Sequence, residues 1–163
     1  MEPILYIVNI ESAKGIREAS FEEIMAGARR AMARRVRKGA GLRSPKLVQE
    51  FLSLKLGTLE HEVFCVAYLD NRQRLIEFVE LFRATIDGAG VHPREVVKQA
   101  LQLNAAAVIF AHPHPSGVAE PSQADELMTR KLREALAFVD IRVLDHLIVA
   151  GSDVVGFAER GLL

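Results

Sequence analysis

The chain has 163 residues, of which 50% are hydrophobic, and its 21 Lys and Arg are balanced by 21 Asp and Glu. This length and composition suit one folded core with a short extension and exclude a largely disordered chain. No run of about 18 apolar residues indicates a membrane span, and a single cysteine cannot form an internal disulfide. We therefore expect a soluble, cytoplasmic protein.

Residues 1–43 are predicted to form a basic N-terminal extension. Its pattern indicates a short strand at 4–10, a helix at 21–37 and a glycine-containing linker at 39–43. Residues 29–43 carry positive charge without any acid, and the side chains that could meet nucleic-acid phosphate are Arg29, Arg30, Arg34, Arg35, Arg37 and Lys38. A solvated basic helix end is the alternative, because no aromatic residues interleave for base stacking.

Residues 44–163 predict an α/β (α+β) domain, in which a mixed sheet is flanked by helices. Ser44 caps the first helix, Pro45 opens it, and Gly57 ends it at the C′ position. Cys65 lies in an apolar run and is expected to be a small core residue. The helices are expected at 45–56, from 93 onward and at 123–139, and the strands at 63–69, 74–82, 105–111, 141–149 and 154–158.

Two histidines one residue apart, His112 and His114, follow the apolar strand at 105–111, and the carboxylate of Asp125 comes eleven positions later. Ser122 is a good N-cap, which places Asp125 in the first helical turn, pointing back toward the histidines. Two imidazoles and one carboxylate suit zinc and leave a fourth position for water, as in hydrolytic zinc sites. The pattern predicts a zinc site; the alternative is a rigid surface loop before a capped helix.

Hydrolysis at such a site also needs a general base, and glutamate is the usual choice. The candidates are Glu60, Glu62 and Glu80. Strand alternation points Glu80 at the apolar face, where an ion pair with Arg83 or Arg94 would be its structural role.

The sequence His-x-His-Pro followed by Ser and Asp at these spacings resembles the signature of the JAMM (MPN+) metalloprotease family. From about Ser44 to the C-terminus the chain resembles the bacterial RadC branch, which is associated with DNA repair; the matching segments are Thr85-Ile-Asp-Gly, His92–Lys98 and Pro115–Asp125. This resemblance implies a three-layer fold akin to that of cytidine deaminases and a zinc-dependent peptidase or isopeptidase activity. It also implies that Glu62, just before an apolar strand, is the general base.

In JAMM relatives the serine that matches Ser122 supports the oxygen that gains charge on the scissile carbonyl, a use that competes with helix capping. The resemblance has departures. Pro113 stands where relatives have Ser, Thr or Asn, so a backbone donor and a polar side chain are lost. Residues 12–19 look like a fragment of a helix-hairpin-helix unit with only one glycine of the expected pair.

The alternative function is a non-catalytic metal-binding module that acts in DNA repair or recombination complexes. A zinc deaminase is excluded, since it needs a Pro-Cys-x-x-Cys motif and the chain has one cysteine. Among the remaining histidines, His92 is expected at a helix start, His61 lacks a partner at metal spacing, and His146 is expected to be a satisfied core residue.

Overall fold

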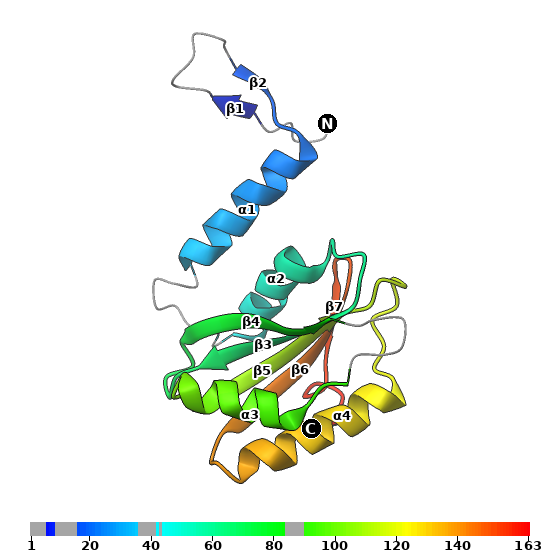
Figure 1. Cartoon of the computed structure of the whole chain (residues 1–163). Helices are drawn as coiled ribbons and strands as arrows, with labels where there is room; N and C mark the ends of the chain where they lie inside the picture. The colour runs from blue at the N-terminus through cyan, green and yellow to red at the C-terminus, as the bar shows by residue number, and fades with distance from the viewer. Residues whose placement is uncertain (1–5, 9–15, 36–41, 43, 84–89) are drawn as a thin grey trace.

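The computed structural model describes residues 6–8, 16–35, 42, 44–83 and 90–163. Its main body is a five-stranded sheet with α2 on one face and α3 and α4 on the other (Figure 1). This is the mixed, three-layer α/β architecture expected from the sequence. The elements are α2 (Pro45–Leu56), β3 (Val63–Leu69), β4 (Leu75–Arg83), α3 (Pro93–Gln102), β5 (Ala107–Pro113), α4 (Gln123–Ala137), β6 (Arg142–Ala150) and β7 (Asp153–Gly156).

The strands are arranged in the order β4-β3-β5-β6-β7. The central pair, β5 and β6, is parallel, because α4 carries the chain back across the sheet between them, whereas the other neighbours are antiparallel. The predicted hairpin between β3 and β4 is confirmed. Its turn is held by the Asp70 carboxylate, which accepts hydrogen bonds from the backbone N–H groups of Arg72 and Arg74.

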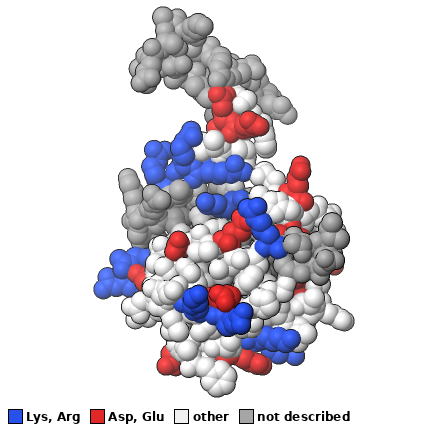
Figure 2. Space-filling model, in the orientation of Figure 1, with Lys and Arg blue, Asp and Glu red and all other residues white. Residues whose placement is uncertain are grey.

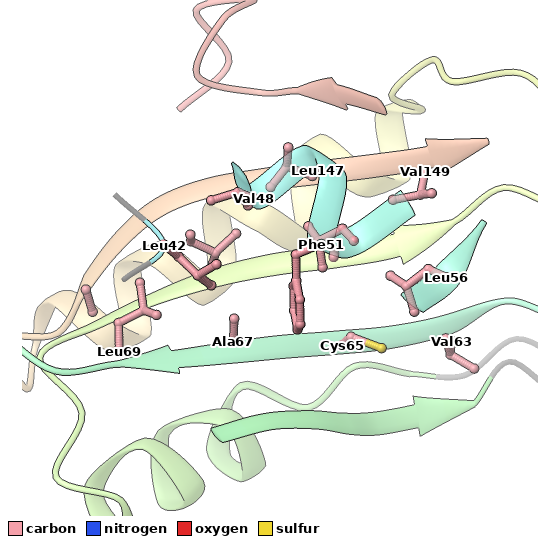
Figure 3. Close-up of a cluster of buried hydrophobic side chains, with 14 residues drawn as sticks. Leu42, Val48, Phe51, Leu56, Val63, Cys65, Ala67, Leu69, Leu147 and Val149 are labelled. Atoms are coloured by element: carbon pink, nitrogen blue, oxygen red, sulfur yellow. The ribbon is translucent and has the colours of Figure 1, made fainter. Parts of the chain in front are cut away.

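Alternate residues of the central strands pack into two separate cores. On the α2 side, Phe51 and Leu56 point from the helix onto Cys65 and its neighbours (Figure 3). On the opposite side, Phe64 and Phe110 pack beneath α3 and α4. Full burial of one such side chain stabilises the fold by ~1.5–3 kcal/mol. Burial, with a smaller contribution from Glu80, raises the pKa of the Cys65 thiol to about 12, which fits a core residue rather than a nucleophile.

Gly57 does not end α2 in the way predicted. It is the C-cap itself and has right-handed helical dihedral angles (φ −63°), so it is not needed for a left-handed turn. A Cβ at this position would lie 2.3 Å from the Gly151 carbonyl oxygen. Glycine is required here because the end of α2 and the turn after β6 approach each other through their backbones.

Two other sequence predictions need correction. The strand expected at 105–111 begins at Ala107 and continues through Pro113, so His112 lies inside β5 rather than after it. The helical spacing of Val96, Val97, Ala100 and Leu101 predicts that all four lie on the buried face of α3. Leu101 is instead 56% exposed, and the helix is buried chiefly through Val96 and Ala100.

The N-terminal region contains β1 (Tyr6–Val8), which pairs antiparallel with β2 (Ile16–Glu18), and α1 (Phe21–Arg35). Strand β2 was not predicted; it occupies part of the segment that resembles a helix-hairpin-helix fragment, whose residues 12–15 lie outside the described residues. Leu42, predicted in the linker, is buried in the α2-side core. The predicted division at residue 43 stays a prediction. Among the helices that the structure describes, none has the length and hydropathy needed to cross a membrane.

Candidate metal centre

The site lies where the end of β5 meets the start of α4. His112 follows Phe110 on the face of β5 that α4 covers, and His114 comes one residue after the strand ends. Pro115 and Gly117, with φ +80° at Gly117, then turn the chain back toward α4. This path brings Asp125, in the first turn of α4, against both imidazoles.

His112, His114 and Asp125 form a group that could hold a metal ion, since one ligand atom from each lies within 4.8 Å of the others. The Nε2 atoms of the two histidines are 2.9 Å apart. The Asp125 carboxylate oxygens lie 3.3 Å from Nε2 of His112 and 3.7 Å from Nε2 of His114. Zinc–nitrogen bonds of ~2.0–2.1 Å set two imidazole nitrogens about 3.3 Å apart on a tetrahedral ion, so the histidines need to part only slightly.

Ser122 and Asp125 form the predicted N-cap, as a reciprocal capping box. The Ser122 hydroxyl donates to Oδ2 of Asp125 (2.6 Å) and accepts from the backbone N–H of Asp125 (3.2 Å). Burial opposes ionisation of Asp125, but its contact with the His112 imidazole and the hydrogen bonds that it accepts from the Ser122 hydroxyl and backbone N–H outweigh burial and hold the pKa of this carboxyl well below its usual range. The cap therefore fixes an ionised carboxylate beside the histidines.

A hydrogen bond on the outer side of His114 fixes which ring nitrogen carries the hydrogen. Its Nδ1 lies 3.0 Å from the Val118 carbonyl oxygen, which can only accept, so Nδ1 carries the hydrogen. In the neutral ring the lone pair is then on Nε2, which faces His112 and Asp125. The Nε2 lone pair and the Asp125 carboxylate can both donate electrons to a cation between the three residues. A zinc ion needs ligand atoms of this kind.

His146 is a satisfied core histidine, as predicted, but it also contacts the site. It is fully buried in β6, with its Nε2 2.9 Å from Nδ1 of His112 and its Nδ1 2.6 Å from the Thr129 hydroxyl. Burial lowers the pKa of His146 well below its usual value, which makes the ring neutral. Sequence reasoning missed the contact with His112 because it depends on the parallel register of β5 and β6, in which Phe110 is opposite His146.

Glu62 is exposed immediately before β3, the place expected from the sequence. Strand β3 pairs with β5 up to Cys65 opposite Ala111. If this register continued beyond the paired residues, Glu62 would be opposite His114, and residues directly opposite share a face of the sheet. Phe64, between Glu62 and the paired region, stacks against the His112 ring with centroids 6.5 Å apart. The role of Glu62 as general base stays a prediction, since the pairing of β3 with β5 ends at Cys65 and Ala111.

The other acids are placed differently. Glu80 is opposite Cys65, on the α2 face of the sheet, and pairs with Arg83 at 2.5 Å, so it has the predicted structural role and faces away from the histidines. Glu60 and Glu120 are exposed. Neither belongs to the group that could hold a metal. Of the remaining histidines, His92 is at the N-cap position of α3 and His61 is exposed.

Pro113 is accommodated without loss of a sheet hydrogen bond. The His114 N–H donates to the Val149 carbonyl in β6 (2.8 Å), and Pro113 is opposite Val149 in the parallel register. The nitrogen of Pro113 itself therefore faces the other neighbour, β3, whose pairing with β5 has already ended at Ala111. The missing N–H therefore breaks no bond of the ladder that joins β3 and β5.

The basic residues predicted to contact phosphate begin on α1, over which Lys and Arg side chains gather (Figure 2). Arg29 forms hydrogen bonds within the protein: its guanidinium donates to the Leu54 carbonyl and the Thr58 hydroxyl, both at 2.9 Å. Arg30 and Arg34 are exposed. Arg35 ends the helix, and Arg37 and Lys38 lie outside the described residues.

The fold and the site together define a three-layer α/β protein with a His-x-His pair and an Asp arranged as metal ligands. Residues 42–162 match the family model of the RadC-like JAB domain, and the chain belongs to that family. It is 58% identical over 153 residues to a UPF0758 protein of Marinobacter nauticus, covering 92% of this chain and 68% of that protein. A UPF0758 protein of Thioalkalivibrio sulfidiphilus is 52% identical over 168 residues, covering 100% of this chain and 75% of that protein.

Proposed function

We propose that this protein is a zinc-dependent hydrolase that cleaves peptide or isopeptide bonds. The observation that carries the proposal is the convergence of His112, His114 and Asp125 where β5 meets α4. Bound zinc would supply Lewis-acid chemistry, polarising a substrate carbonyl and lowering the pKa of a water molecule. The donors suit zinc because imidazole nitrogens and a carboxylate are its usual ligands and the set contains no thiolate.

In this proposal the Glu62 carboxylate accepts a proton from the attacking water and returns it to the leaving amine. Asp125 is fixed by its capping box, so it can ligate in its ionised form without rearrangement of α4. The Ser122 hydroxyl donates to Asp125 in this structure. Stabilising the developing carbonyl charge would require that hydroxyl to turn from Asp125 to the substrate.

Cleavage of a diverse peptide and isopeptide library tests the activity. Zinc-loaded protein is expected to cleave a subset of the library, and chelator-treated protein is expected to cleave none until zinc is returned. Cleavage that persists without metal would contradict the proposal. So would a wild-type protein that holds zinc but cleaves no member of a library in which all common residues are represented. The second result would favour a non-catalytic metal-binding module.

A separate proposal concerns the basic face of α1. Arg30 and Arg34 are exposed and one helical turn apart, so both can reach the same phosphate backbone. We expect weak binding of a short DNA duplex that falls with salt, and Arg30→Ala with Arg34→Ala should reduce the salt slope by about 2. Arg133→Ala is the control, because Arg133 is exposed but lies on α4 rather than on α1. DNA binding that is unchanged by the two α1 substitutions would contradict this proposal and indicate that the basic face of α1 is only a solvated surface.

A further inference from the structure

Behind His112, on the side away from Asp125, lies a chain of buried hydrogen-bonding groups. It runs from the backbone carbonyl of Asp125 through the Thr129 hydroxyl and both nitrogens of His146 to Nδ1 of His112. Thr129 and His146 are 2% and 0% exposed, so water does not compete for these contacts. The chain begins on the helix that carries one ligand and ends on another ligand.

The direction of every hydrogen bond in this chain can be deduced. A carbonyl oxygen only accepts, so the one hydroxyl proton of Thr129 is donated to the Asp125 carbonyl at 2.6 Å. The Thr129 oxygen must then accept from Nδ1 of His146, also at 2.6 Å. A neutral ring with hydrogen on Nδ1 has a lone pair on Nε2, and this lone pair accepts from Nδ1–H of His112 at 2.9 Å.

We propose that His146, held by Thr129, is a positioning residue that fixes hydrogen on Nδ1 of His112 and so presents Nε2 of that ring to the metal. The inference rests on the proposed metal-dependent function. Aromatic neighbours hold the His146 ring in one orientation: it stacks on Phe157 (centroids 4.6 Å apart) and meets Phe64 and Phe110 edge to face. His146 and Thr129 thus do for His112 what the Val118 carbonyl does for His114.

Two pairs of variants test the proposal through zinc affinity, measured by competition with a chromophoric chelator. Thr129→Val keeps the shape of the side chain but removes the hydroxyl, and Thr129→Ser restores the hydroxyl. His146→Phe keeps a ring among the aromatic neighbours and removes both nitrogens, whereas His146→Gln restores a donor and an acceptor. We expect zinc binding to be about 10- to 100-fold weaker in Thr129→Val and His146→Phe. Thr129→Ser should recover most of that loss, and His146→Gln should recover part of it.

Ring hydrogen positions in metal-free protein provide the second readout, by proton–nitrogen NMR at about pH 8, above the ordinary histidine pKa. We expect hydrogen on Nδ1 of both His112 and His146, and none on Nε2 of His146; Thr129→Val should remove this preference. Hydrogen on Nε2 of His146 would overturn the inference, as would unchanged zinc affinity in folded Thr129→Val and His146→Phe. Wild-type protein that binds no zinc would instead refute the proposed function, because the NMR readout needs no metal.

Discussion

His114→Ala is expected to reduce bound zinc from about one ion per chain to almost none. The remaining ligands, His112 and Asp125, supply one nitrogen and one carboxylate, which is fewer than the three protein ligands of a catalytic zinc site. Loss of an outer partner of a ligand typically weakens metal binding 10- to 100-fold, so loss of the ligand itself should exceed about a hundredfold. Metal analysis of protein dialysed against trace zinc measures the zinc content per chain, and competition titration measures the zinc affinity.

The matched control for this measurement is His61→Ala. His61 is exposed and lies outside the group of His112, His114 and Asp125, so its replacement should leave the zinc content unchanged. Circular dichroism of both variants shows whether the fold is retained. Equal zinc in wild type and folded His114→Ala would refute the metal site, and equal loss in both variants would mean that the bound zinc is adventitious.

Glu62→Gln is expected to reduce turnover by roughly a hundredfold or more while zinc remains bound. The amide keeps the size and hydrogen-bonding capacity of the side chain but cannot take a proton from water. Glu62 is exposed and belongs to neither hydrophobic core, so stability should change little. Turnover is measured on any substrate that the peptide and isopeptide library yields, with zinc content determined on the same samples.

Glu60→Gln serves as the control, because Glu60 is also exposed and is only two residues away. We expect it to keep wild-type turnover. A normal rate in Glu62→Gln with a large loss in Glu60→Gln would transfer the role of general base to Glu60. Full activity in both variants would exclude a glutamate base before β3, and Glu80 would not replace it because it faces the α2 side of the sheet.

Much of the fold can be predicted from local sequence patterns. Strand β3 has the bounds expected from its seven-residue apolar run, Val63–Leu69, since all seven residues are buried. The hairpin that follows is also local. In contrast, β2 has only three residues, Ile16–Glu18, and exists through its pairing with β1, which no periodicity in so short a segment can indicate.

The candidate site shows the same division. The grouping of His112, His114 and Asp125 was predictable because a strand end, a tight loop and an N-cap are encoded within fourteen successive residues. The contact of His146 with His112 joins residues 34 positions apart and is set by the register of two parallel strands. The bulge between Val108 and Ile109 shifts that register, so even a correct list of strands would have placed His146 wrongly.

Pro113 has a consequence for the shape of the sheet at the site. Its carbonyl faces β3 without an N–H beside it, so this position can accept a hydrogen bond from a neighbouring strand but cannot return one. A hydrogen-bonded antiparallel pair needs both bonds, so Pro113 cannot extend the ladder beyond Ala111, the last residue of β5 that pairs with β3. Glu62 and His114 therefore both lie beyond the last paired residues of their strands, Cys65 and Ala111, where no ladder bonds join β3 to β5.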